Sequence, residues 1–124
     1  VRIIADFTDV DQIYSLKSYM HSIFNNLIRN SIKYRNPDQQ PLITIKSTKE
    51  NGKIILTFKD NGLGIDLNKH GTKVFGLYKR FHTHLKGKGI GLFMVKAQVE
   101  ALGGQITIAS EINKGTEFTI IFEI

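Results

Sequence analysis

The sequence predicts an α+β fold, a two-layer α/β sandwich in which helices cover one face of a mixed, mostly antiparallel sheet. Strand-like segments occur in pairs joined by the turns Asn51-Gly52 and Asn113-Lys114-Gly115, and such hairpins build antiparallel sheets. Two longer segments carry apolar residues at helical spacing. The 124 residues, 41% of them hydrophobic, are enough for one core, so residues 1–124 are predicted to form a single domain.

The N-terminal part is predicted to form a strand, Val1 to Phe7, and then a long helix, Ser18 to Tyr34. Ser18 can cap this helix, and Asn36-Pro37-Asp38 ends it because the residue before a proline avoids helical backbone. At 100° per residue, one broad arc of the helix faces the core. Its members are Met20, Ile23, Phe24, Leu27, Ile28 and Ser31.

The middle of the chain is predicted to contain a hairpin of two strands, Leu42 to Lys49 and Lys53 to Lys59. A loop is expected from Asp60 to Gly71, followed by a short helix over about Thr72 to Phe81 and by a brief link up to Lys86. Asp60 therefore stands directly after a strand.

The C-terminal part begins with a second long helix, Gly89 to Leu102, which Gly103-Gly104 ends. Most of its positions are apolar, so the helix is expected to be buried on more than one side. Two strands follow, Gln105 to Ser110 and Thr116 to Ile124. In the last strand every second residue from Phe118 is apolar, which is typical of one buried face.

Bulk composition excludes several classes of protein. The net charge is +6, because 17 Lys and Arg outnumber 11 Asp and Glu. The basic residues are scattered, with no block of five like charges. The sequence also lacks the platform of aromatic and basic residues that is typical of nucleic-acid binding. Cysteine is absent, so disulfides and thiolate metal sites are excluded. No run approaches the roughly 20 apolar residues of a membrane helix. Because position 1 is Val, we expect a fragment of a longer protein.

An asparagine and lysine stripe on the first helix is the first candidate site. Asn26, Asn30 and Lys33 are separated by four and three residues, so they share one helix face, which we expect to lie opposite the apolar arc. A solvated face is the simple interpretation. However, Asn costs roughly 0.5 kcal/mol or more relative to Ala within a helix. Its amide oxygens could complete a magnesium shell, and Lys33 could face phosphate. Taken alone, the stripe leaves both interpretations open.

Two glycine-bearing segments are further candidates. Asp60-Asn61-Gly62-Leu63-Gly64 could offer a carboxylate to an exocyclic amine such as that of adenine, although taken alone the motif is more often an ordinary turn after an edge strand. Gly87-Lys88-Gly89-Ile90-Gly91 opens the second helix, where backbone N–H groups could bind an anion. This run lacks the preceding strand of a dinucleotide fingerprint and the Ser or Thr of a phosphate-binding P-loop.

Taken in order, these segments resemble the motifs of sensor histidine kinases. Asn26 to Tyr34 resembles the N box, Asp60 to Ile65 the first glycine box, and Gly87 to Leu92 the second. Phe75 to Arg80 is similar to the F box, and Gly115-Thr116-Glu117-Phe118 to the terminal Gly-Thr-x-Phe element. The resemblance covers essentially the whole chain and implies the Bergerat ATP-binding fold, in agreement with the architecture above.

The resemblance also implies roles for individual residues. Asn30, supported by Asn26, would hold Mg²⁺, and Lys33 would contact the phosphates of ATP. Asp60 would bind the adenine amino group, with Thr116 supporting it through water. Tyr34 and Ile65 would line the adenine or ribose, and Gly62 and Gly64 would admit the ring. Arg80 would approach the γ-phosphate. The phosphates would be bordered by Gly87, Lys88, Gly89, Ile90, Gly91 and Leu92.

Departures from the pattern refine this expectation. The helix from Ser18 to Tyr34 has no Glu to activate water, which disfavours fast ATP hydrolysis and favours phosphoryl transfer. None of the four histidines has the context of a phospho-acceptor, so the chain is expected to bind ATP without phosphorylating itself. The resemblance implies a cytoplasmic domain, a homodimeric parent that could be anchored in a membrane, and two partners: the parent's dimerisation and phospho-acceptor domain, and a response-regulator receiver domain. A serine kinase of the anti-sigma type and a degenerate nucleotide sensor are the alternatives.

Overall fold

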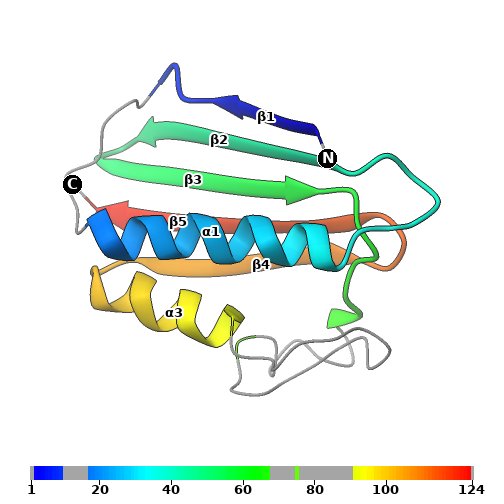
Figure 1. The fold of residues 1–124 in the computed structure, drawn as a ribbon. Coiled ribbons are helices and arrows are strands. Elements are labelled where there is room, and N and C mark those ends of the chain that lie inside the picture. Colours follow the sequence, from blue (N-terminus) through cyan, green and yellow to red (C-terminus); the bar gives the residue numbers. More distant parts are fainter. Residues whose placement is uncertain (1, 10–16, 68–74, 76–90, 124) are drawn as a thin grey trace.

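The computed structural model describes residues 2–9, 17–67, 75 and 91–123. Within them, a five-stranded sheet carries the helices α1 (Lys17–Lys33) and α3 (Gly91–Ala101) side by side on one face (Figure 1). The strands are β1 (Arg2–Asp6), β2 (Leu42–Glu50), β3 (Lys53–Asp60), β4 (Gln105–Glu111) and β5 (Gly115–Glu123). Their order is β1-β2-β3-β5-β4. Only β1–β2 is a parallel pair, so the predicted mixed, mostly antiparallel two-layer fold is confirmed.

Strand alternation separates a buried face from an open one. Phe58 lies opposite Ile45 on one side and opposite Phe118 on the other, and these three side chains are almost fully buried. The next residue of β3, Lys59, is exposed on the face away from the helices. Because neighbouring strands keep this register, one continuous apolar surface faces the helices. It consists of Ile43, Ile45, Leu56, Phe58, Phe118, Ile120 and Phe122.

Helix α1 covers this surface with the predicted arc. Ile23 and Leu27 are fully buried, Ser31 is 7% exposed, and Met20, Phe24 and Ile28 pack against the core from its edge. The Phe24 ring meets Phe58 edge to face at a centroid distance of 4.9 Å. The arc therefore fixes the rotation of α1 about its axis, and with it the direction in which the asparagines point.

Element boundaries differ from prediction by a few residues, as helix ends and strand ends commonly do. Helix α1 begins at Lys17, and the second strand of each hairpin is slightly shifted, with β3 reaching Asp60 and β5 starting at Gly115. The predicted short helix lies outside the described residues except for Phe75, whose ring lies 6.2 Å from that of Phe118. Figure 1 places the beginning of α3 near the end of β3, where the candidate site is expected.

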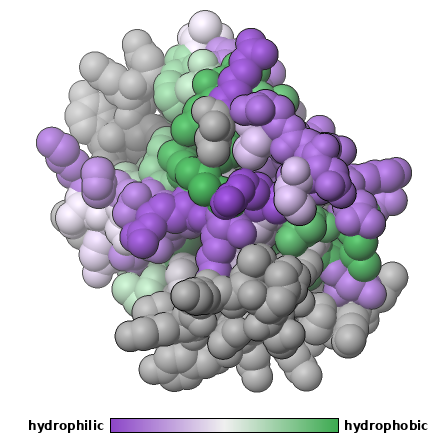
Figure 2. Space-filling view, turned by 45° about the vertical axis from the view of Figure 1, so that its right-hand side comes forward, coloured by the Kyte–Doolittle hydropathy of each residue, from purple (hydrophilic) through white to green (hydrophobic). Residues whose placement is uncertain are grey.

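The surface is mostly hydrophilic, with scattered apolar residues. Figure 2, turned toward the end of the molecule where β3 stops, shows charged and polar residues interrupted by green apolar areas. The large apolar side chains with substantial exposure are Ile3, Ile4, Phe7, Phe93, Met94 and Ile112. Among the described helices, none has the length and apolar character needed to cross a membrane.

Candidate nucleotide-binding site

Asp60, the last residue of β3, is the most highly connected polar side chain of the site. Its Oδ1 accepts hydrogen bonds from the backbone N–H groups of Gly62, at 2.9 Å, and Thr116, at 3.3 Å. Its Oδ2 accepts a hydrogen bond from the Ser31 hydroxyl of α1, at 2.9 Å. Asp60 thus joins β3, β5 and α1, and its carboxylate is held in one orientation before any ligand arrives.

The environment of Asp60 also controls its protonation. Burial raises the pKa of this carboxyl group above its ordinary value of 3.8, while the hydrogen bonds from Gly62, Ser31 and Thr116 oppose the shift by stabilising the charged form. The donors compensate only in part for lost hydration. In its charged form, the carboxylate can only accept hydrogen bonds, and it can bind an N–H donor of a ligand.

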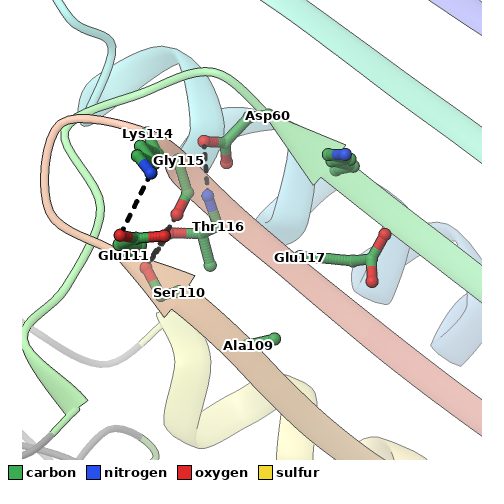
Figure 3. Close-up of a pocket in the computed structure, with 9 residues that line it drawn as sticks. Asp60, Ala109, Ser110, Glu111, Lys114, Gly115, Thr116 and Glu117 are labelled. Carbon is green, nitrogen blue, oxygen red and sulfur yellow. Dashed lines mark hydrogen bonds and ion pairs between the residues drawn. The ribbon is translucent and has the colours of Figure 1, made fainter.

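Thr116 and Ser110 form the floor of the same end of the sheet. They lie opposite each other on β5 and β4, and their hydroxyl oxygens are 2.8 Å apart. The Ser110 hydroxyl also donates to the Gly115 carbonyl at 2.9 Å, and it accepts a hydrogen bond from the Ile65 N–H at 2.8 Å. Figure 3 shows this cluster beside Asp60, with the Thr116 N–H directed toward the carboxylate.

The segment from Gly62 to Ile65 is held between α1 and the β4–β5 turn. Leu63 donates to the Tyr34 carbonyl at 2.9 Å and accepts from the Asn113 N–H at 2.7 Å. A Cβ atom at Gly62 would lie 2.6 Å from the Tyr34 carbonyl oxygen, and one at Gly64 would lie 2.1 Å from the Glu111 carbonyl oxygen. Both glycines therefore permit close backbone approach within the protein. That they also admit the ring, as the family resemblance implies, stays a prediction.

Asn61 ties the same segment to β2. Its side-chain oxygen accepts from the Leu42 N–H, and its amide nitrogen donates to the Gln40 carbonyl, both at 2.9 Å. The two contacts satisfy backbone groups at the beginning of β2, where the chain enters the sheet. The segment from Asn61 to Ile65 is consequently anchored on three sides: at Tyr34 directly after α1, at the start of β2, and at the β4–β5 turn.

The asparagine stripe begins with Asn26, which is partly buried beside the start of α3. Its amide nitrogen donates to the Ser22 hydroxyl one turn earlier, at 3.3 Å. Its amide oxygen is the atom nearest to Gly91, 3.7 Å from the position of a Cβ there. The hydrogen bond to Ser22 therefore directs the oxygen of Asn26 toward the first residue of α3.

The stripe lies on the flank of α1. The prediction from the sequence, which placed it opposite the core, is wrong. Asn26, Asn30 and Lys33 are each partly buried, and the fully exposed face carries residues such as His21 and Arg29 instead. The reason is that α1 packs against α3 as well as against the sheet. At the end of the stripe, the Lys33 ammonium lies 5.1 Å from the centre of the Tyr34 ring.

A hollow of about 450 Å³ lies beside the base end of the site, toward the uncovered face of the sheet. It is lined by Lys59, Asp60, Ala109, Ser110, Glu111, Lys114, Gly115, Thr116 and Glu117. Figure 3 views it with the helices behind the strands. Its lining holds both basic and acidic residues, and Lys114 pairs with Glu111 at 3.2 Å. Because no residue of α1 lines it, this hollow is not the phosphate-binding region predicted from the asparagine stripe.

Comparison with known proteins identifies the domain. Residues 16–124 match the family model described as histidine kinase-, DNA gyrase B- and HSP90-like ATPase. The chain belongs to this ATPase family. The Bergerat-type sandwich expected from the sequence, with Asp60 at the end of a central strand and the asparagines on the facing helix, is thus the fold of a known ATP-binding domain.

Individual relatives narrow the assignment within this ATPase family. The chain is 33% identical over 112 residues to the sensor protein RprX of Bacteroides fragilis, covering 87% of this chain and 21% of that protein. It resembles the mycobacterial sensor histidine kinase MprB with a TM-score of 0.79 and 20% identity, over 98% of this chain and 81% of the other. Full-length ShkA in complex with AMPPNP gives a TM-score of 0.80 at 20% identity, over 97% of this chain and 25% of that one.

The ATPase domain spans only part of such proteins, about a fifth of RprX. Its relatives include sensor histidine kinases, and it corresponds to their ATP-binding catalytic domain. The predicted family, the fold class and the assignment as an ATP-binding catalytic domain are therefore confirmed.

The structure brings two groups of the predicted residues together, and the other predicted site residues stay predictions. Asp60, Thr116 and Ile65 meet at the sheet end, and Asn26 meets Gly91 at the start of α3. Leu92 is buried in the core beneath α3, so its side chain serves packing. Arg80, Gly87, Lys88, Gly89 and Ile90 lie outside the described residues of the ATPase domain.

Four polar residues of the site were missed as site residues by the sequence analysis: Ser22, Ser31, Asn61 and Ser110. Ser22, Ser31 and Ser110 form hydrogen bonds with other residues of the site. Asn61 instead bonds to the backbone of Leu42 and Gln40. Ser31 had been assigned to the core face, where a hydroxyl group needs a hydrogen-bond partner, and this need was a usable signal. Ser110 faces Gly115 and Thr116 across the predicted β4–β5 hairpin, so these two contacts could have been found from strand pairing. Its third partner, Ile65, is 45 residues away, and no local pattern indicates that contact.

Proposed function

We propose that this domain binds ATP with Mg²⁺ and donates the γ-phosphoryl group to a histidine of the phospho-acceptor domain of its parent protein. The observation that carries the proposal is the preformed Asp60 carboxylate, which three donors hold at the end of β3. A partly buried carboxylate of this kind matches the exocyclic amino group of adenine, which is a donor.

The phosphate end is proposed to use the partly buried flank of α1. Asn30 and Asn26 offer neutral oxygen ligands, and this set fits Mg²⁺, whose other ligands would be phosphate oxygens and water. Bound there, the ion would neutralise charge on the phosphates. Lys33 would add a point charge, and Arg80 would approach the γ-phosphate. Backbone N–H groups between Gly87 and Gly91 would border the phosphates at the start of α3.

The chemistry left to this chain is positioning. During transfer, an imidazole nitrogen attacks the γ-phosphorus, the bond to the bridging oxygen breaks, and ADP leaves with the bonding electrons. Helix α1 offers no Glu to activate water against the phosphate, so the site favours transfer over hydrolysis. We further propose a cytoplasmic location, a homodimeric parent, possible membrane anchorage of that parent, and a response-regulator receiver domain as the next phosphoryl acceptor. No nucleic-acid partner is proposed.

Two measurements test the proposal. Titration of this chain with a fluorescent ATP analogue, with and without Mg²⁺, is expected to show binding that the metal strengthens. Addition of the parent's histidine-bearing domain in trans, with ATP labelled at the γ-phosphate, is expected to give acid-labile phosphate on that domain. ATP binding without transfer would point to a nucleotide sensor, and acid-stable phosphate on the partner would point to a serine kinase.

A further inference from the structure

We propose that Ser110 sets the nucleobase selectivity of the site by fixing the direction of the Thr116 hydroxyl proton. This inference rests on the proposed function, because it concerns the same nucleotide site. Ser110 belongs to β4 and Thr116 to β5, and the two residues lie directly opposite each other in the antiparallel pair. Ser110 thus acts through Thr116 and is a positioning residue.

The Ser110 hydroxyl has three partners within hydrogen-bond distance. The Ile65 N–H group approaches it at 2.8 Å and can only donate. The Gly115 carbonyl oxygen lies at 2.9 Å and can only accept. The Thr116 hydroxyl lies at 2.8 Å and can do either. The direction of this third hydrogen bond follows from the first two.

A serine hydroxyl group has one proton and two lone pairs. The proton of Ser110 lies toward the Gly115 carbonyl, because two oxygen atoms at 2.9 Å repel each other unless a proton lies between them. The Ile65 N–H fills one lone pair. Thr116 must therefore donate into the other lone pair, and all the hydrogen-bonding capacity of Ser110 is used within the protein.

The consequence for the base pocket is that Thr116 and Asp60 both present lone pairs. The Thr116 proton is directed to Ser110, and Thr116 is 8% exposed, so its hydroxyl has little water to exchange with. The ionised Asp60 carboxylate can only accept, and it already accepts from Gly62, Thr116 and Ser31. A base edge that reaches this pair meets acceptors on both sides.

Acceptors that face the 6-position distinguish two classes of purine. The 6-amino group of adenine donates hydrogen bonds, whereas a 6-oxo purine places a carbonyl oxygen at the same position, and lone pairs would then face lone pairs. If the Thr116 hydroxyl could rotate, it could donate to that carbonyl group and relieve part of the repulsion. Ser110 prevents this rotation, and adenine selectivity depends on it.

The test compares the affinities of the wild-type chain for ATP and for inosine triphosphate, which carries a 6-oxo group and no additional amino group. We expect a preference for ATP of about 100-fold, as for other sites built around a buried hydrogen bond. Ser110→Ala is expected to reduce the ATP-to-ITP ratio about tenfold, because the Thr116 proton becomes free to rotate. Thr107→Ala, an exposed hydroxyl removal on the same strand, is the matched control and should leave the ratio unchanged.

A purely structural role for Ser110 would weaken both nucleotides equally, and an unchanged ratio in Ser110→Ala would overturn the inference. In a Thr116→Val background, adding Ser110→Ala should not lower the ratio further, since the hydroxyl on which Ser110 acts is gone. An additional decrease would also overturn it. If Ser110→Ala does not fold, Thr116→Val alone decides: a wild-type ratio in this variant means that the hydroxyl does not read the base. Absence of ATP binding by the wild-type chain would instead overturn the proposed function.

Discussion

The base end and the phosphate end of the site are built in different ways. At the base end, Asp60 and Thr116 stand at the ends of paired strands, and hydrogen bonds to Ser31 of α1, to Gly62 directly after β3 and to Ser110 of β4 hold them. At the phosphate end, Asn26, Asn30 and Lys33 project from one flank of a single helix, and Asn26 is oriented by one local hydrogen bond, to Ser22. The base end is thus assembled by tertiary contacts, and the phosphate end by helix periodicity.

The difference indicates a division of labour. A buried, fully bonded pocket can recognise a flat base without a metal ion, because its groups need no reorganisation when the ligand arrives. Partly exposed asparagine side chains gain their full value only with the ion and phosphates that they are proposed to bind. We therefore expect variants at the base end to act with or without Mg²⁺, and variants at the phosphate end to act only with Mg²⁺.

The strongest test of the base end is Asp60→Asn. An amide group has a single acceptor oxygen, so one position now occupied by a carboxylate oxygen would turn a donor toward another donor. We expect nucleotide affinity to fall by about 100-fold or more, equally with and without Mg²⁺. Calorimetric titration measures both conditions, and Asp38→Asn, an exposed carboxylate in a turn, serves as the control. A loss seen only with Mg²⁺ would contradict the proposed division.

The anchoring of the segment from Asn61 to Ile65 is tested by two glycines that share one backbone conformation. Gly64 and Gly52 have φ angles of 73° and 75°, but a Cβ at Gly64 would lie 2.1 Å from the Glu111 carbonyl oxygen, whereas nothing lies within 4 Å at Gly52. Gly52→Ala should lower the free energy of unfolding by about 1 kcal/mol, and Gly64→Ala by about 3 kcal/mol or more. Urea denaturation compares them. Equal effects would mean that the segment moves aside easily.

Acid pH should weaken the base end before it affects ordinary carboxylates. Burial raises the pKa of Asp60, so its protonation begins above the usual titration range near 3.8. Affinity should fall about tenfold per pH unit once the pH drops below this raised pKa. A raised pKa also means that the folded state binds the Asp60 proton more tightly than the unfolded state does. The contribution of this residue to the free energy of unfolding therefore increases as the pH falls through the raised pKa. Titrations in a pH series, with thermal unfolding as the control, separate lost binding from unfolding.

Asn30→Ala tests the phosphate end. Loss of a neutral ligand oxygen should reduce ATP affinity by about tenfold with Mg²⁺ and leave affinity without the metal nearly unchanged. Asn25→Ala, at an exposed position of the same helix, is the matched control for helix propensity. Titration with and without Mg²⁺ measures the effect, and an equal loss in both conditions would assign Asn30 to the base end.

Ser22→Ala should have the smallest effect of the series. Without the hydroxyl, the Asn26 amide can turn, and its oxygen would face Gly91 for only part of the time. We expect a loss of about threefold in affinity for ATP with Mg²⁺, less than is typical for a residue that supports a metal ligand, because the Asn26 oxygen still faces Gly91 for part of the time. Ser22→Thr keeps the hydroxyl and should restore binding. An effect of Ser22→Ala that persists in an Asn26→Ala background would exclude action through Asn26.

Helix periodicity predicted the phosphate end from the sequence. The spacing of Asn26, Asn30 and Lys33 placed them on one face, because residues three and four apart on a helix are neighbours. The same argument put the stripe opposite the core, which was wrong by part of a turn. No local pattern in the sequence indicates that α3 packs against α1, and this second contact makes a flank of the helix partly buried.

Strand and turn signals predicted the sheet and the position of Asp60 at the end of one of its strands. Local hydrophobic alternation and turn residues are enough for this, since they act between neighbours in the chain. What the sequence alone determined is therefore the set of elements and which residues share a face. Only the tertiary structure decided that Ser31, Gly62, Thr116 and Ser110 converge on one carboxylate and one hydroxyl. Hydrogen bonds between residues up to 56 positions apart depend on how the strands and α1 pack. A pattern among neighbours in the sequence does not predict such contacts.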